Sequence, residues 1–127
     1  MPKQAINPEG HFKASFYSQG VKVGGTVYVA GQVGSKDGDV AGGGQDVAAE
    51  ARQALENVRN VVEAAGGTMA DVVQLTCFLT DIEQGGVLHP IIGELFPGDK
   101  PAVTSIVVRS LGSLKYKMEI QATVVLD

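Results

Sequence analysis

Two β-rich runs close the chain, KPAVTSIVVR at residues 100–109 and KYKMEIQATVV at residues 115–125. Both runs are rich in β-branched residues, and the Leu-Gly-Ser-Leu segment between them supplies turn residues. In the second run apolar and polar residues alternate until Val125. This alternation predicts a strand with one face in the core and with Glu119 in the middle of the other, less apolar face.

The first of these runs is expected to be a partner strand of the second, and its odd positions mix valines with polar groups. Such a mixture suits a surface that a second subunit covers better than one exposed to water. From the residues alone, we expect only that the chain is not a monomer. The residues expected on the uncovered face are Val103, Val107, Val125 and either Val29 or Tyr28.

The rest of the chain follows from hydrophobic periodicity and turn residues. Gly24-Gly25 predicts a two-residue hairpin loop, and Asp46 predicts the N-terminal cap of a long amphipathic helix. The predicted elements are strands at residues 17–23 and 26–32, a helix from 46 to 66, a strand at 72–80, a helix at about 87–95 and the two final strands.

This order, ββαβαββ, predicts the α+β class. Each helix has one apolar stripe, and both stripes are buried most economically on the same face of one mixed sheet of four to six strands. With 127 residues, of which 44% are hydrophobic, the chain can bury one core, so we expect a single domain over residues 1–127.

Composition excludes several classes of partner. The net charge is −4 and the ten Lys and Arg residues are scattered, which argues against a nucleic-acid partner. One cysteine cannot form an internal disulfide. The N-terminus has no apolar h-region and no stretch approaches 18 apolar residues, so we expect a soluble cytoplasmic protein with no membrane partner.

Several motifs are spread over nearly the whole chain. They are Tyr17-Ser18-Gln19-Gly20-Val21, Ala30-Gly31-Gln32, the helical segment 51–58, Thr76-Cys77-Phe78-Leu79-Thr80-Asp81, Pro101-Ala102-Val103-Thr104 and Met118-Glu119-Ile120. Together they resemble the RidA/YjgF family, the reactive-intermediate deaminases. The resemblance implies a chorismate-mutase-like fold, a homotrimer with a small-molecule site in each of three inter-subunit clefts, and no metal or organic cofactor.

The resemblance also implies which residues act. In the family, a glutamate at the position of Glu119 orients or activates the water that attacks a C=N bond, and a tyrosine at the position of Tyr17 lies at the cleft. We therefore predict Glu119 and Tyr17 as catalytic residues and Gly31 as a substrate-binding residue. The alternative is structural: Glu119 solvated or paired with Lys117 or Arg109, and Tyr17 an ordinary amphipathic strand residue.

One position departs from the family pattern. In the deaminating members the residue after Pro-Ala is an arginine that binds the substrate carboxylate, and here that residue is Val103. Because a bidentate arginine–carboxylate contact is strong, its loss predicts that ordinary 2-iminoacids are not the main substrates. Arg109 is too far along the same strand to replace it within one chain.

Ser105 and His89 complete the predicted substrate-binding residues, together with Gly31 and Val103. Ser105 falls where many family members have a cysteine or another small residue at the pocket wall, so a hydrogen-bonding role is expected. No Gly-x-Ser-x-Gly elbow or His-Asp pair marks it as a nucleophile. His89 falls where deaminating members tend to have an asparagine, although a surface position at a helix end is the alternative.

Three other features predict no site. Gly42-Gly43-Gly44 lacks the neighbouring residues of a phosphate-binding loop, Cys77 is expected to be an inert core thiol, and two isolated histidines do not make a metal site. The function implied by the resemblance is hydrolysis of an enamine or imine of a small, reactive nitrogenous metabolite. The alternatives are a non-catalytic small-molecule-binding or regulatory trimer and a ribonuclease, an activity attributed to some relatives.

Overall fold

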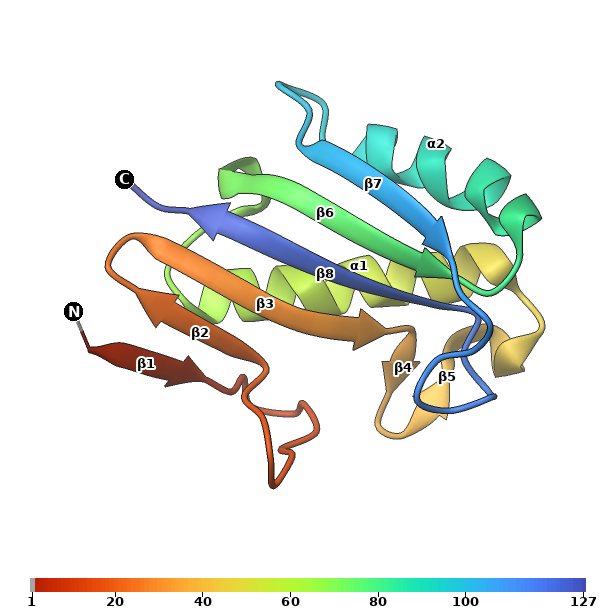
Figure 1. Ribbon diagram of the computed structural model, residues 1–127, viewed down its shortest axis with the longest axis horizontal. Coiled ribbons are helices and arrows are strands. Elements are labelled where there is room, and N and C mark those ends of the chain that lie inside the picture. The colour runs from red at the N-terminus through yellow and green to blue at the C-terminus, as the bar shows by residue number, and fades with distance from the viewer. Residues whose placement is uncertain (1) are drawn as a thin grey trace.

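A six-stranded mixed sheet in the order β1-β2-β3-β8-β6-β7 is the frame of the protein (Figure 1). The structure is a computed structural model that describes residues 2–127. All neighbouring strands are antiparallel except β6 and β7, which are parallel. The strands of this sheet are β1 (Lys3–Ile6), β2 (Gly20–Val23), β3 (Thr26–Val33), β6 (Val72–Leu79), β7 (Ala102–Val107) and β8 (Met118–Val125).

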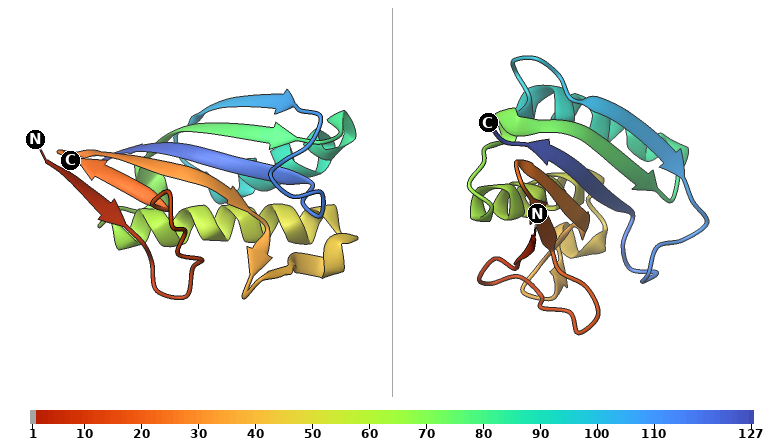
Figure 2. Two further views of the ribbon diagram at one scale, coloured as in Figure 1. Left: turned by 60° about the horizontal axis from the view of Figure 1, so that its bottom comes forward. Right: turned by 60° about the vertical axis from the view of Figure 1, so that its left-hand side comes forward.

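Two helices, α1 (Val47–Ala64) and α2 (Gly85–Leu95), cover the same face of the sheet, as the amphipathic patterns predict (Figure 2). The Asp46 side chain accepts a hydrogen bond from the Ala49 N–H at 3.0 Å and caps α1. The protein is therefore of the predicted α+β class. The shorter elements are β4 (Ser35–Lys36), β5 (Asp39–Val40) and the 3₁₀ turns η1 (Ala41–Gly44), η2 (Met69–Asp71) and η3 (Ile82–Gln84).

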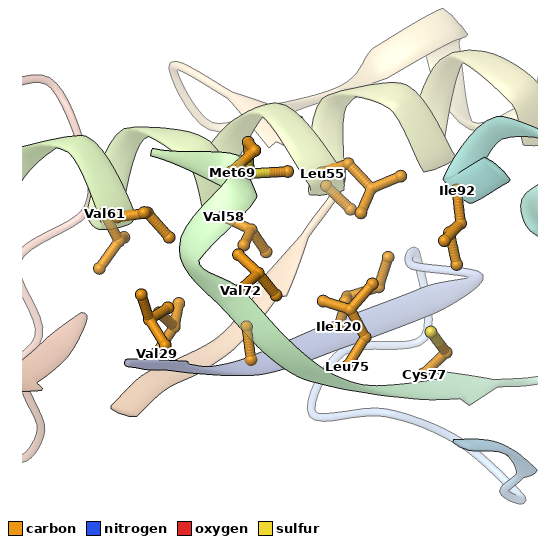
Figure 3. Packing of buried hydrophobic residues seen from close by; sticks show 14 of the residues in the cluster. Val29, Leu55, Val58, Val61, Met69, Val72, Leu75, Cys77, Ile92 and Ile120 are labelled. Carbon is orange, nitrogen blue, oxygen red and sulfur yellow. The ribbon is translucent and has the colours of Figure 1, made fainter. Parts of the chain in front are cut away.

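The core lies between the helices and the covered face of the sheet (Figure 3). The alternation in β8 is confirmed, because Met118, Ile120, Ala122 and Val124 are all buried. They pack with the inward residues of β6 and with the apolar stripe of α1, such as Leu75 and Leu55. Burial of each large aliphatic side chain contributes about 1.5–3 kcal/mol, so this layer is the main source of stability.

The predicted pairing of the last two strands is wrong, because β6 lies between β7 and β8. Helix α2 connects β6 to β7 as a crossover, and this connection makes those two strands parallel. The segment between Val107 and Met118 then carries the chain past the end of β6, and β8 pairs with β3 and β6 (Figure 1). That segment is far longer than a tight hairpin loop.

This topology also corrects the predicted faces of β7. Val103 is in register with Leu75 and Ser105 with Cys77, so both point to the helix side of the sheet. Glu119 is in register with Phe78, which places it on the other face. The sequence pattern had suggested that Val103 and Glu119 share a face. In the structure they lie on opposite faces of the sheet.

The face without helices nevertheless has exposed apolar side chains. Tyr28, Val125 and Ile106 are 55%, 48% and 43% exposed, and they come from β3, β8 and β7. Val29 is instead buried under α1, which resolves the alternative between Val29 and Tyr28 in favour of Tyr28. Exposed apolar residues on three strands of one sheet are typical of a surface that another molecule covers.

Smaller differences concern chain segments with weak patterns. The predicted first strand begins at Gly20, so Tyr17 lies in the loop before β2. The glycine-rich connector forms the β4–β5 hairpin, whose turn has positive φ at Asp37 and Gly38. Helix α2 begins two residues earlier than predicted and contains Pro90 beyond its first turn.

Candidate functional site

The first part of the candidate site is Tyr17, Gly31 and Glu119, which we call the carboxylate half-site. Glu119 is the second residue of β8, and its neighbours in register are Val33 on β3 and Phe78 on β6. The strand therefore holds the half-buried carboxylate in the middle of the sheet face that has no helices.

Gly31 makes room for that carboxylate. It lies where the register between β3 and β8 is irregular, between Val29 and Gln32. A Cβ atom at Gly31 would be 2.6 Å from the Glu119 carboxyl carbon and 2.7 Å from its Oε2. Any larger residue at Gly31 would displace the Glu119 side chain.

The carboxylate also has an altered acidity. Burial raises the pKa of Glu119 above its ordinary value of 4.5. Lys117, one of the partners suggested by the sequence, instead donates from its Nζ to the Gly44 carbonyl. Among residues 2–127 no ion pair involves Glu119. A half-buried carboxylate with a raised pKa is a stronger base than an exposed one, which suits a group that accepts and returns a proton.

Tyr17 lies at the rim of a cavity of about 970 Å³ that Gly31 also lines. The tyrosine is 39% exposed, and its ring contacts the Phe16 ring edge to face, with 4.9 Å between the ring centres. The backbone near the glutamate and the tyrosine ring thus border one solvent-accessible space, which is large enough for a small metabolite.

Two buried amides position the Tyr17 loop, and sequence reasoning did not single them out. Gln32 donates from Nε2 to Gln19 Oε1 at 2.8 Å, and Gln19 donates from Nε2 to the Phe12 carbonyl at 2.7 Å. Both glutamines are nearly inaccessible to solvent. Since buried amides need partners, this network fixes the loop on β3. Both residues fall inside recognised motifs, but a polar residue in a motif does not by itself indicate burial.

The second part of the candidate site is His89, Val103 and Ser105, which we call the histidine–serine half-site. Its residues line a cavity of about 460 Å³ between α2 and β7. His89 Nε2 and Ser105 Oγ are 2.8 Å apart, which is hydrogen-bond distance. The structure thus gives Ser105 a histidine partner that was not apparent from the sequence, because α2 and β7 bring together residues 16 positions apart.

The serine lies beside a core cysteine. Ser105 on β7 is in register with Cys77 on β6, and burial raises the pKa of the Cys77 thiol to about 11. Cys77 is therefore a neutral thiol at pH 7, as expected for a core cysteine.

The two half-sites lie on opposite faces of the same sheet. Glu119 is on the face without helices, whereas Val103 and Ser105 point to the helix side. Within one chain, the structure brings Gly31 together with Glu119, and His89 together with Ser105. It does not bring the two pairs together.

Glu50 is a further buried carboxylate that sequence reasoning missed. It belongs to α1 and is fully buried. Its Oε2 accepts a hydrogen bond from the Lys117 N–H at 2.5 Å, while no described residue bonds its Oε1. Because Lys117 is two residues before Glu119, this contact fixes the chain where β8 begins. A glutamate near the start of a helix is usually exposed, so no sequence signal marks this one.

Two features are absent from residues 2–127. No group of three or more His, Cys, Asp or Glu side chains in this part of the chain could hold a metal ion. None of its helices combines the length and the apolar character needed to cross a membrane.

Comparison with known proteins gives the family. Residues 7–126 match the family model described as endoribonuclease L-PSP. The chain belongs to this family. It is similar to the YyfA protein of Yersinia pestis, described as a protein of unknown function of the conserved Rid family, with 26% identity and a TM-score of 0.91. That comparison covers 98% of this chain and 100% of the other.

Two further solved structures are similar to this chain over nearly their whole length. The YjgF gene product of E. coli shares 32% identity and gives a TM-score of 0.86, with 96% of this chain and 98% of that chain covered. RidA of an Antarctic Psychrobacter shares 32% identity and gives a TM-score of 0.88, with coverage of 97% and 99%. These matches confirm the predicted resemblance to the RidA/YjgF proteins.

Proposed function

We propose that this protein is an enamine/imine deaminase-like hydrolase that acts on a small reactive nitrogenous metabolite and is a poor catalyst with ordinary 2-iminoacids. The observation that carries the proposal is the Glu119 carboxylate, half-buried against Gly31, with a raised pKa. Membership of the endoribonuclease L-PSP family, with RidA among its similar structures, supports the same reaction class.

The reaction needs few groups. An enamine first tautomerises to an imine. Glu119 then accepts a proton from water as the water oxygen bonds to the C=N carbon, and the imine nitrogen takes up a proton. The resulting carbinolamine loses ammonia and leaves a carbonyl compound, so one imine and one water give one carbonyl compound and one ammonia. Tyr17, which lines the cavity, supplies a hydroxyl group for a hydrogen bond to the departing nitrogen in this proposal.

The separation of the two half-sites supports an inter-subunit site. A closed ring with head-to-tail contacts can bring the Glu119 face of one subunit against the histidine–serine half-site of the next. Three such contacts make a homotrimer with three clefts, and the exposed Tyr28, Ile106 and Val125 would be covered in it. We also propose that residues 1–127 are one domain, because the buried side chains form one cluster.

Two measurements test the proposal. Light scattering should give a mass three times the 13.2 kDa of the chain. Ammonia release should be measured from matched pairs of imines that are generated in situ by amino-acid or amine oxidation. One imine of each pair is uncharged, and the other has a 2-carboxylate. Faster release with the uncharged imine is expected, and it should depend on Glu119.

The outcomes separate this proposal from the alternatives. If no imine is hydrolysed but small carbonyl compounds bind, the protein is a non-catalytic binding trimer. Cleavage of RNA would indicate the activity that the family description names, but the net charge of −4 offers little attraction for phosphates. A monomer mass at micromolar concentration would contradict the inter-subunit site.

A further inference from the structure

The buried polar side chains of the protein gather around one region of the sheet. Among residues 2–127, five of them are almost inaccessible to solvent: Gln19, Gln32, Glu50, Asn57 and Gln84. The first two hold the Tyr17 loop on β3, and the other three bond the chain segments that flank Glu119. Because a polar group is buried without a penalty only when it is hydrogen-bonded, their concentration in one region favours a positional role.

Glu50 reaches from the first turn of α1 to the residue before β8. Its Oε2 accepts a hydrogen bond from the Lys117 N–H at 2.5 Å. The Lys117 carbonyl accepts from the Thr80 N–H at 3.0 Å and from Thr80 Oγ1 at 2.9 Å, and Lys117 Nζ donates to the Gly44 carbonyl. Gln84 holds Thr80 in turn, through bonds to its N–H and its hydroxyl. Every polar group of Lys117 is therefore bonded.

A second side chain of α1 holds the neighbouring strand. Asn57 lies about two turns after Glu50, on the same side of the helix. Its Nδ2 donates to the Val33 carbonyl at 2.8 Å and to the Ser35 carbonyl at 2.9 Å. Val33 is in register with Glu119. Helix α1 therefore bonds both the strand that carries the carboxylate and the strand beside it.

Gly34 allows α1 to approach the sheet this closely. A Cβ atom at Gly34 would be 2.5 Å from the Glu50 Cγ and closer still to the Glu50 carbonyl oxygen. The first turn of α1 thus packs directly on the chain that leaves β3, and the Glu50 side chain is confined between that chain and β8.

Lys117 is two residues before Glu119, so a displacement of Lys117 moves the start of β8 and the carboxylate with it. We propose that Glu50 is a positioning residue for Glu119: by accepting from the Lys117 N–H, it fixes the start of β8 and thereby the place of the Glu119 carboxylate against Gly31. Glu50 contacts no substrate in this role. Its importance for turnover rests on the proposed function, whereas its effect on Glu119 can be measured without a substrate.

Two replacements separate the hydrogen-bond acceptor from the bulk of the side chain. Glu50→Gln keeps an oxygen that can accept from the Lys117 N–H, and Glu50→Met keeps a flexible side chain of similar length without that oxygen. The readout is the pKa of Glu119 in the full-length protein, from an NMR titration of ¹³C-labelled carboxyl groups in which Glu119→Gln assigns the signal.

Glu50→Met should lower the pKa of Glu119 toward 4.5, by about 0.5, because a displaced carboxylate regains contact with water. Glu50→Gln should leave this pKa unchanged. A folded Glu50→Met protein with the wild-type pKa of Glu119 would overturn the proposal, and so would an equal change in Glu50→Gln. If Glu50→Met does not fold, Glu50→Asp replaces it, since its carboxyl group is one methylene too short to reach Lys117 and the same decrease is expected.

Two further variants control for a general loss of stability. Val62→Ala leaves a cavity near the other end of α1, and it should lower the melting temperature without changing the pKa of Glu119. Glu63→Met is the same exchange as Glu50→Met at an exposed position of α1, and it should change neither quantity. If Val62→Ala changed the pKa of Glu119 as much as Glu50→Met, the effect would be one of stability and the proposal would be overturned.

Turnover gives a second readout, with the imine that the wild-type protein hydrolyses fastest. Glu50→Met should lower kcat about ten- to hundredfold, because small displacements of a catalytic group are costly. KM should change by less than about threefold, because no contact with the substrate is lost. Wild-type kcat in the folded Glu50→Met protein would overturn the proposal. If the wild-type protein hydrolyses no imine, the proposed function fails, and the NMR titration still decides the role of Glu50.

Discussion

The two half-sites of this protein differ in the charged groups that they present. The carboxylate half-site holds a charge against a glycine in the middle of a sheet, and burial raises the pKa of Glu119. The cavity of the histidine–serine half-site is lined by Lys100, whose Nζ is bonded to helix carbonyls, and by His89, which is bonded to Ser105. The comparison suggests a division of roles, with chemistry on one face of the sheet and ligand selection on the other.

The largest effect is expected from removing the charge of the carboxylate half-site. Glu119→Gln should lower ammonia release by about 10²–10⁴-fold, because an amide cannot take a proton from water. The fold should remain, since the side chain keeps its shape and lies on the helix-free face. Circular dichroism and light scattering provide the control. Unchanged turnover in the folded variant would remove Glu119 from the mechanism.

The second prediction adds a guanidinium group to the histidine–serine half-site. Val103→Arg should strengthen pyruvate binding by roughly thirty- to a thousand-fold if the guanidinium forms a bidentate contact worth on the order of 2–4 kcal/mol. Without ligand, the partly buried arginine should lower the melting temperature, and added pyruvate should restore it. A folded Val103→Arg protein that binds pyruvate no better than wild type would show that other residues determine ligand charge.

The third prediction concerns the glycine that supports the carboxylate. Gly31→Ala should reduce turnover about ten- to hundredfold, because its Cβ would displace Glu119 from a position where small shifts matter. A matched control is Gly98→Ala, at a glycine whose Cβ would meet no atom within 4 Å. Equal activity of the two variants would contradict the packing of Glu119 on Gly31.

The smallest expected effect is on the pH dependence of the free energy of unfolding. The folded pKa of Glu119 is raised above 4.5, so the native state binds more protons than the unfolded state just above that pH. The contribution of Glu119 to the free energy of unfolding therefore falls as pH rises through this window. Glu119→Gln should melt at the same temperature as wild type near pH 4 and a few degrees higher at pH 7. A difference that does not change with pH would show that burial does not affect this carboxyl group.

The sequence predicted most of the sheet because its signals there are local. Alternation in β8, the apolar stripe of α1 and the cap at Asp46 each depend on neighbouring residues, and the structure confirms them. The order of the strands in the sheet could not be predicted, because no local signal determines it. Whether β7 joins β8 or β6 depends on the crossover through α2, and an alternating pattern fits either neighbour.

The candidate site was also predictable only in part: single residues could be predicted from motifs, but contacts between distant residues could not. The motifs indicated Glu119 and Gly31, and the structure places them in contact distance of one another. The bond between His89 and Ser105 depends on how α2 packs on β7, which no residue spacing encodes. The buried Glu50 was missed for the same reason, because its partner Lys117 is far away in the sequence.

The most direct test of a site shared between subunits is complementation of two inactive variants. Glu119→Gln damages one half-site, and Val103→Trp fills the cavity of the other. Co-expression with different tags, followed by purification on both tags, gives mixed trimers in which one cleft of the three combines two unaltered half-sites. Mixed trimers should therefore regain about a third of wild-type ammonia release. No recovery in trimers shown to contain both chains would contradict a site formed by two subunits.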